Sequence, residues 1–226
     1  MSMTSSVLEI FLRRVVEEWL PTFCKDRGYC VSNFRSVSVT ICEADARDCM
    51  LAIDKKVVVD HKGGRYRAAR SSAHEVFFWD GTRKISPRST WLWFETIIIF
   101  AGVGRLHQKF RWPCSLLATQ PKGWAFDIAA YLTEFEPTPY ILAEVKKSIA
   151  ELDRLCQDLE SLSAGADSNS VKANSWKKWC ALIEMKPTVL WLLGPGEVQY
   201  LFSPEYTTDG ALLHKTNSSV LDFPVK

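Results

Sequence analysis

Two neighbouring apolar segments that each carry one acid constrain the fold of this chain most. Residues 124–133 and 140–146 both read as strands, with Asp127 within the first and Glu144 within the second. The turn between them, at 136–139, contains two prolines, and proline cannot continue a central strand because it donates no ladder hydrogen bond. We therefore expect two strands that are related as a hairpin.

Strand geometry predicts which side chains of these two segments meet. Side chains alternate along a strand, so Glu144 and Lys146 point to the same face, about 6.7 Å apart along the chain. Neighbouring strands lie about 4.8 Å apart, so Asp127 lies beside Glu144 if the two segments pair. The sequence thus predicts two carboxylates and one ammonium at one edge of a sheet.

Two close carboxylates repel each other and invite a hard divalent cation, which here indicates Mg²⁺ (or Mn²⁺) held by Asp127 and Glu144. Such a cation polarises a phosphoryl oxygen and lowers the pKa of a bound water. Lys146 would orient that water and stabilise the negative charge that develops on the phosphate. The alternative is structural: residues 144–147 form a polar strand end, and Asp127 pairs with a nearby arginine.

The segments around these strands predict a mixed sheet. In chain order we expect first a long apolar helix at 87–101, opened by Ser86 and ended by Gly102 and Gly104, then a strand at 115–119 and the two acid-bearing strands. An amphipathic helix at 148–162 and a shorter helix at 176–185 follow. The chain then forms a hairpin of 188–193 with 198–202 around Gly194-Pro195-Gly196, and a loosely held tail follows Ser203. A three-stranded meander followed by a crossover helix is typical of a mixed sheet with helices on its faces.

The first part of the chain has a different pattern of apolar residues. Residues 5–20 show helical spacing of apolar side chains that Pro21 closes, and residues 31–80 read as an antiparallel β-rich lobe with a turn at Gly63-Gly64. We therefore predict an α/β protein with two parts. Residues 1–86 form an N-terminal α+β lobe, and residues 87–226 form a mixed β-sheet core flanked by helices.

The charge of the chain is nearly balanced, with a formal net charge of +2, so any nucleic-acid footprint must be local. The clearest basic stretch runs over residues 55–70, where Lys62, Arg65, Arg67 and Arg70 are candidates for phosphate contacts; the alternative is a solvated hairpin. The nine tryptophans usually indicate packing, although several could supply stacking surfaces. Residues 176–179 read as a helix with one buried face, base stacking being the alternative.

Several classes of protein are disfavoured. The seven cysteines form no CxxC pair, which favours buried reduced thiols in a cytoplasmic protein over a disulfide framework or a zinc site. The most apolar window, residues 91–103, is too short to span a bilayer and contains Glu95. The N-terminal helix is interrupted by charges, unlike an export signal. No membrane partner is expected.

The spacing of Asp127, sixteen intervening residues, and then Glu144-Val145-Lys146 resembles the PD-(D/E)XK superfamily, which has the restriction-endonuclease-like fold. The resemblance covers roughly residues 87–202. It implies that Asp127, Glu144 and Lys146 are catalytic, and that Glu95 is the additional glutamate that this family often takes from the helix before the meander. The sequence departs from the family name at Phe126, where a proline is implied.

The resemblance implies a Mg²⁺-dependent endonuclease or exonuclease that hydrolyses DNA phosphodiester bonds, and cleavage of both strands would favour a homodimer. The chain could also serve as a subunit of a larger complex. Two alternatives remain open. One is a catalytically inactive nuclease-fold protein that binds nucleic acid or scaffolds a protein partner, and the other is a hydrolase of RNA or nucleotides on the same core.

Overall fold

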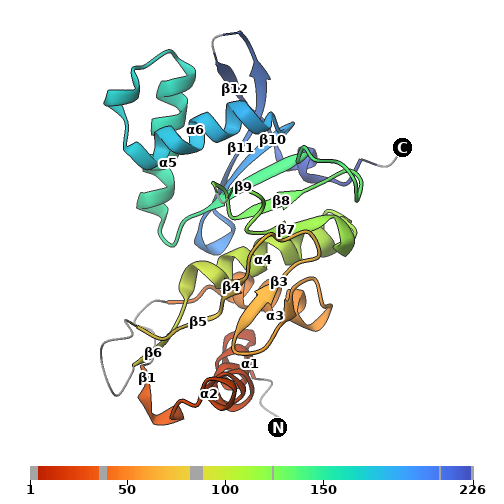
Figure 1. The fold of residues 1–226 in the computed structure, drawn as a ribbon, viewed down its shortest axis with the longest axis vertical. Coiled ribbons are helices and arrows are strands. Elements are labelled where there is room, and N and C mark those ends of the chain that lie inside the picture. The colour runs from red at the N-terminus through yellow and green to blue at the C-terminus, as the bar shows by residue number, and fades with distance from the viewer. Residues whose placement is uncertain (1–4, 36–39, 82–88, 124, 209, 225–226) are drawn as a thin grey trace.

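The computed structural model describes residues 5–35, 40–81, 89–123, 125–208 and 210–224 (Figure 1). Within these residues the largest sheet, called here the main sheet, has the order β12-β11-β10-β9-β8-β7. Its strands are β7 (Leu117–Thr119), β8 (Ile128–Ala130), β9 (Ile141–Val145), β10 (Val189–Leu193), β11 (Gln199–Tyr206) and β12 (Ala211–Lys215). Helices pack on both faces of this sheet, which makes the protein α/β.

The pairing of the strands confirms the expected meander. Strands β7, β8 and β9 are antiparallel neighbours, and β10 then pairs with β9 in parallel. A parallel return needs a crossover, which α5 (Ile149–Ser163) and α6 (Ala173–Met185) provide. Strands β10 and β11 form the expected hairpin around residues 194–196.

Alternation along β9 divides the interior into two layers. Ile141, Ala143 and Val145 belong to one hydrophobic cluster, which lies on the side of α4 (Phe94–Gln108). Leu142 belongs to the other cluster, which lies under α5 and α6. Because side chains alternate, Glu144 is directed to the same side as Leu142. The catalytic candidates on β9 therefore face α5 and α6.

Helix α4 differs from the predicted helix at 87–101. Residues Thr90–Leu92 form strand β6, and the helix begins at Phe94; the expected start at residues 86–87 lies outside the described residues. Gly102 and Gly104 do not end the helix but lie within it. A Cβ atom on Gly104 would lie 2.4 Å from the carbonyl oxygen of Asp48, so this glycine permits close packing of a neighbouring helix.

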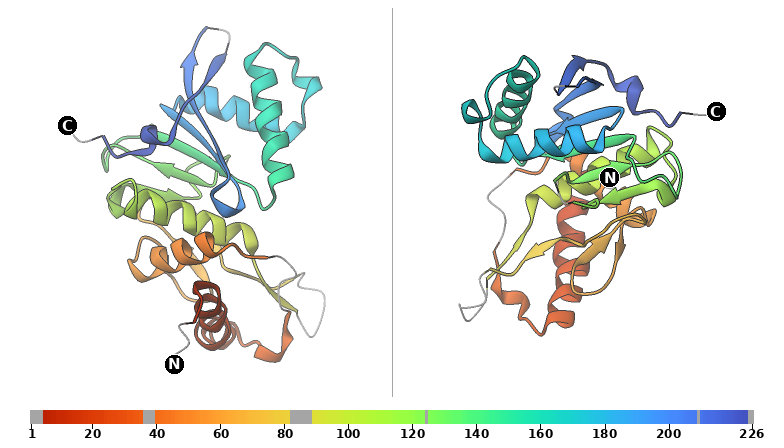
Figure 2. Two further views of the ribbon diagram at one scale, coloured as in Figure 1. Left: turned by 180° about the vertical axis from the view of Figure 1, so that it is seen from behind. Right: turned by 45° about the horizontal axis from the view of Figure 1, so that its top comes forward.

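That neighbour is α3 (Glu43–Asp54), which corrects the prediction of an antiparallel β lobe over residues 31–80. Ala46, Cys49 and Ala52 recur every three residues and are buried, a helical spacing that the β-rich interpretation overlooked. The alternation expected from residue 36 falls partly on 36–39, outside the described residues. Seen from behind, α4 lies between the main sheet and α3 (Figure 2).

Short strands complete this region. They are β1 (Phe34–Arg35), β2 (Val59–Asp60), β3 (Arg65–Arg67), β4 (Glu75–Val76) and β5 (Phe78–Trp79), arranged with β6 in sheets of order β1-β6-β5 and β2-β3-β4. Gly63-Gly64 lies in the turn between β2 and β3, as predicted. Strand β1 pairs with β6 in parallel, so the region is not wholly antiparallel.

The first helix continues past the predicted end at Pro21. Helix α1 (Val7–Arg14) is followed by a π-helical turn at Val15–Trp19 and by α2 (Leu20–Arg27). Pro21 lies in the first turn of α2, where a missing N–H is tolerated. The proline therefore follows a change in helical pitch instead of ending the helix.

The C-terminal segment is anchored, contrary to the prediction of a loosely held tail. Trp112 Nε1 donates a 2.6 Å hydrogen bond to the Leu221 carbonyl, and Phe223 N donates a 2.8 Å bond to the Phe110 carbonyl. Leu221 is buried, and the rings of Phe223 and Trp112 meet edge to face at 5.1 Å between centroids. Apolar residues spaced within a polar segment were the signal that the prediction overlooked.

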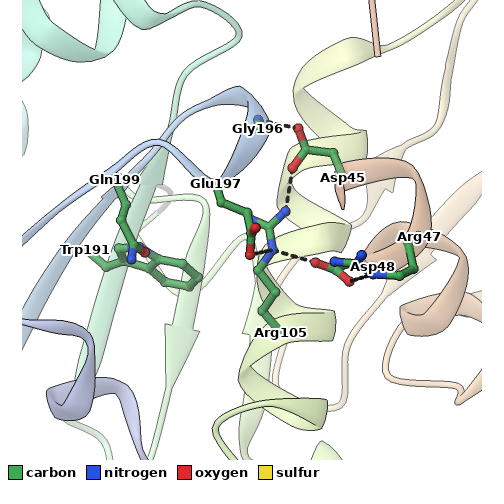
Figure 3. A network of polar contacts seen from close by, with 8 residues as sticks. All are labelled: Asp45, Arg47, Asp48, Arg105, Trp191, Gly196, Glu197 and Gln199. Atoms are coloured by element: carbon green, nitrogen blue, oxygen red, sulfur yellow. Dashed lines mark hydrogen bonds and ion pairs between the residues drawn. The ribbon is translucent and has the colours of Figure 1, made fainter. Parts of the chain in front are cut away.

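A buried ionic network joins α3, α4 and the β10–β11 turn (Figure 3). Arg105 of α4 donates to Asp45 at 2.5 Å and to Asp48 at 2.7 Å, and the backbone N–H of Gly196 donates to Asp45 at 2.7 Å. We call these residues the Arg105 cluster. It fixes the N-terminal region against the main sheet.

No helix in the described ranges combines the length and apolar character needed to cross a membrane. All seven cysteines are free, and Cys24, Cys49 and Cys156 are buried.

Candidate functional site

The strand register brings Asp127 and Glu144 together, as the sequence predicts. Ile128 pairs with Ala143, so Asp127 lies opposite Glu144 at the next position of the antiparallel pair. Asp127 N donates to the Ala143 carbonyl at 3.0 Å, and the backbone N–H of Val145 donates to Asp127 Oδ2 at 2.7 Å. Asp127 and Glu144 are called here the acidic pair.

Glu144 is buried, with 2% of its surface exposed, and two lysines neutralise it. Lys146 contacts Oε1, and Lys178 of α6 donates to Oε2 at 2.5 Å. The Lys178 ammonium also donates to the carbonyl of Ala125 at 2.7 Å. A buried carboxylate is stable only when it is paired and hydrogen-bonded, and here both of its oxygens are engaged.

Sequence reasoning missed Lys178. Helix α6 buries Ser175, Lys178, Trp179 and Leu182, which are spaced by three, four and seven residues and so share one face. The predicted buried face of this helix is present. A lysine within that face is the signal that could have identified Lys178, because a lysine is almost never fully buried without a partner.

The electrostatic environment of Asp127 disfavours its charged form. Its side chain is partly buried, and desolvation together with the nearby Glu144 carboxylate raises the pKa of Asp127 well above the usual range. Desolvation alone would lower the pKa of Lys146, but the carboxylates of Glu144, Asp127 and Glu95 raise it. Lys146 therefore stays charged, and Asp127 is the acid of the pair that lacks a dedicated ammonium.

Glu95 lies in the first turn of α4. Desolvation raises its pKa, and the positive charges of Lys146 and Lys147 oppose that rise. The third predicted acid is therefore close enough to the predicted lysine to interact with it electrostatically.

Glu75 of β4 is an acid near the site that the sequence reasoning missed. Burial raises the pKa of Glu75 to about 7, and Glu95 adds to the shift. Gln120 donates from Nε2 to Glu75 at 2.7 Å, and its backbone N–H donates to the carbonyl of Asp127 at 2.9 Å. Gln120 thus connects Glu75 to the acidic pair. An acid at the start of the apolar run 75–79 was the available signal.

A cavity of about 290 Å³ opens beside Lys146. It is lined by Glu95, Lys146, Lys147, Glu151, Arg154, Leu155, Asp158, Lys172, Asn174 and Ser175. Lys147 approaches Glu151 at 3.8 Å, and Ser175 donates to Asp158 at 2.6 Å. The lining thus mixes four cationic side chains with three carboxylates, and within the described residues no ion pair engages Arg154 or Lys172.

The predicted phosphate contact Arg70 has a structural role. Its guanidinium donates to the carbonyls of Thr133 and Glu136, each at 2.8 Å, and lies 3.6 Å from the centre of the Tyr131 ring. These residues follow β8, whereas Asp127 precedes it. Arg70 therefore holds the loop at the end of β8 opposite to the acidic pair.

The other three predicted phosphate contacts lie on or near β3. Tyr66 is buried between Arg65 and Arg67, so both arginines point to the opposite face of the strand. Arg67 contacts the Ser71 carbonyl, and Arg65 donates to the carbonyl of Lys62 at 3.4 Å. None of the described contacts of these cations reaches the acidic pair, and Lys62 and Arg65 remain exposed.

Among the described residues no group of three or more His, Cys, Asp and Glu side chains is arranged to hold a metal ion. Mg²⁺ keeps several waters, however, and needs only one or two protein carboxylates. The acidic pair supplies two carboxylates, and Asp127 Oδ1 has no described partner. Both oxygens of Glu144 are engaged by lysines, so a cation bound by the pair would have to displace one of them.

The chain was compared with known proteins in three ways, and no family model, curated protein or solved structure matches it. The functional argument therefore depends on the geometry of the site.

Proposed function

We propose that the protein is a metal-dependent nuclease that hydrolyses DNA phosphodiester bonds. One observation carries this proposal: Asp127 lies opposite Glu144, and Lys146 extends from the same face of β9 and contacts Glu144. Two adjacent carboxylates and an ammonium at one strand end are the groups that cation-assisted phosphodiester hydrolysis requires.

The order of the elements supports a restriction-endonuclease-like core. Helix α4 precedes the antiparallel meander of β7, β8 and β9, the amphipathic helix α5 follows, and β10 returns parallel to β9. The two acids lie on consecutive strands of that meander, and Glu95 comes from the helix before it, in the order that the resemblance to the PD-(D/E)XK superfamily implies. Fold alone would not identify an activity, so the proposal depends on the site.

The side chains have distinct roles in this proposal. Asp127 and Glu144 would hold a Mg²⁺ or Mn²⁺ ion, which when bound lowers the pKa of a water and polarises the phosphate. Lys146 orients the attacking water and stabilises the charge that develops on the phosphate oxygens. Glu95 lines the same cavity as Lys146 and, after Glu144 and Asp127, helps to raise the pKa of this lysine. Lys178 neutralises Glu144 until a cation takes over that role.

Binding of the cation tests the proposal directly. Calorimetric titration with Mn²⁺ should detect one site in the wild type, and binding should be lost in the double variant Asp127→Ala, Glu144→Ala. The variant Asp158→Asn, which removes a carboxylate from the cavity wall and leaves the acidic pair intact, should retain the site. Absence of binding by the wild type at millimolar Mn²⁺ would contradict the proposal.

A specific observation favours a second candidate. Both oxygens of Glu144 are already engaged by ammonium groups, as expected of a nuclease-fold protein without catalysis that binds nucleic acid or scaffolds a partner. In that case the acids act structurally. DNA binding that persists in EDTA, together with absent Mn²⁺ binding and absent cleavage, would select this candidate. A panel of DNA and RNA substrates separates a deoxyribonuclease from an RNA hydrolase.

A further inference from the structure

Three exposed tryptophans gather on one face of the β5–β6 hairpin. Trp79, Trp91 and Trp93 have exposed fractions of 41%, 38% and 38%. The register pairs Trp79 with Trp91, and alternation directs Trp93 to the same side as Trp91. The rings of Trp79 and Trp93 lie 5.2 Å apart between centroids, at 40° to each other. We call these three residues the Trp platform.

Packing among the described residues does not account for the Trp platform. The opposite face of the hairpin carries Phe78 and Leu92, which are paired and buried, so the sheet already has an apolar inner face. Large aromatic side chains that gather on an outer face mark an interaction surface. The backbone of Trp93 is fixed, since its N–H donates to the carbonyl of Phe77 at 3.0 Å. The Trp platform is thus held in place by the strands below it.

The charged residues near the Trp platform include Arg35 on one side and Glu95 on the other. Arg35 of β1 is exposed and pairs with Trp91, so it lies on the same face of the sheet. Glu95 follows Trp93 by two residues and lines the cavity beside Lys146. The Cα atoms of Trp93 and Glu95 are therefore no more than about 7 Å apart. Figure 1 shows β5 and β6 leading to the start of α4, on the side where α5 begins.

We propose that the Trp platform stacks the unpaired bases of a DNA single strand and leads the strand to the cavity beside Lys146. Every base has a π-face, so tryptophans bind single strands with little sequence preference. Arg35 beside Trp91 suits a ligand that carries phosphates between its bases. The delivery of the strand for cleavage, but not the stacking itself, rests on the proposed function.

Binding in EDTA tests the stacking separately from catalysis. Fluorescence anisotropy with labelled oligothymidylate should show that Trp91→Ala and Trp79→Ala each weaken binding roughly 5- to 100-fold, the range for loss of one stacked base. Trp176→Ala is the matched control, because Trp176 is also 38% exposed but lies on α6. Its affinity should be unchanged. Duplex DNA of equal length should bind more weakly than the single strand.

The Arg35→Gln variant tests the positive charge beside Trp91. Loss of one phosphate contact should weaken binding for all sequences alike and reduce the slope of log affinity against log salt by about one. A slope equal to that of the wild type would remove Arg35 from the proposed surface.

Photocrosslinking of the wild type guards against variants that fail to fold. Oligonucleotides that contain 5-iodouracil should crosslink to Trp79, Trp91 or Trp93, as identified by mass spectrometry. Crosslinks confined to other residues, or equal affinity of all tryptophan variants, would overturn the proposal. If Trp91→Ala instead abolishes self-association in sedimentation and leaves DNA affinity unchanged, the surface binds protein and the proposal fails.

The two proposals fail separately. Binding that depends on the Trp platform without metal-dependent cleavage would support stacking and reject the nuclease. Metal-dependent cleavage by a protein whose DNA affinity does not depend on these tryptophans would support the nuclease and reject stacking.

Discussion

Two buried ionic clusters in the described part of the protein differ in the kind of cation that pairs with their carboxylates. In the Arg105 cluster, one guanidinium lies between Asp45 and Asp48, and a backbone N–H completes the coordination of Asp45 (Figure 3). Around the acidic pair, two lysines share Glu144, and Asp127 accepts a backbone N–H at one oxygen. The first cluster joins two helices and a turn, and Lys146 of the second lines a cavity.

Under the proposed function, the first cluster would use buried charge structurally and the second would use it in catalysis. Arginine presents a rigid fork that suits fixed carboxylates, whereas lysine is a mobile point charge that can be displaced. Desolvation and then the neighbouring Glu144 carboxylate raise the pKa of Asp127, and a bound cation would oppose both effects.

The largest effect on stability should come from Arg105→Met. This variant leaves two buried aspartates without their cation, and breaking a buried pair in this way costs about 3–5 kcal/mol of the free energy of unfolding. Urea denaturation should show a lower midpoint with an unchanged slope. Arg111→Ala, which removes an exposed arginine near Asp222, should leave the midpoint almost unchanged. Equal midpoints for the two variants would show that the Arg105 cluster is not structural.

Glu75 should make stability depend on pH. An acid whose pKa rises on folding stabilises the fold at low pH, and that contribution is lost as the pH rises through the folded pKa of about 7. Glu75→Gln should therefore stabilise the protein at pH 8 by up to about 3 kcal/mol relative to the wild type, and by much less at pH 5. Urea midpoints at the two pH values measure this difference. The exposed Glu134→Gln serves as control, and a gain that is equal at both pH values would refute the explanation.

A smaller effect on stability, but a specific one on cation binding, is expected for Lys178→Met. Glu144 keeps Lys146, so the loss of one hydrogen-bonded partner should cost about 1–3 kcal/mol. Removal of the competing ammonium should tighten Mn²⁺ binding roughly tenfold, measured by calorimetry. Lys177→Met, on the exposed face of the same helix, should change neither quantity. Unchanged or weaker Mn²⁺ binding in Lys178→Met would show that the cation does not replace this lysine.

The parts of the site that could be predicted are those set by short-range rules. The pairing of Asp127 with Glu144 and the common face of Glu144 and Lys146 follow from strand alternation and from a hairpin-like connection. Lys178 and Glu75 could not be placed in this way, because they arrive from segments distant in sequence, and their positions depend on how a helix and a short strand pack.

The same limit explains the errors in the fold. Gly104 reads locally as the end of a helix, and only the approach of Asp48 on α3 reveals why a glycine is needed inside α4. The tail after Ser203 reads as polar, and its order depends on Leu221 docking onto Trp112. Local patterns predicted the meander and the crossover helix, whereas contacts between distant segments decided the remaining elements.

The most direct test of the account is cleavage of circular plasmid, linear duplex and single-stranded DNA with Mn²⁺ or Mg²⁺, comparing the wild type with Lys146→Ala and Lys177→Ala. The account predicts metal-dependent cleavage by the wild type and by Lys177→Ala, and a loss of roughly 100-fold or more in Lys146→Ala, as for removal of a group that stabilises the transition state. Equal cleavage by all three proteins, or none by the wild type under any of these conditions, would contradict the assignment of a nuclease centre to Asp127, Glu144 and Lys146.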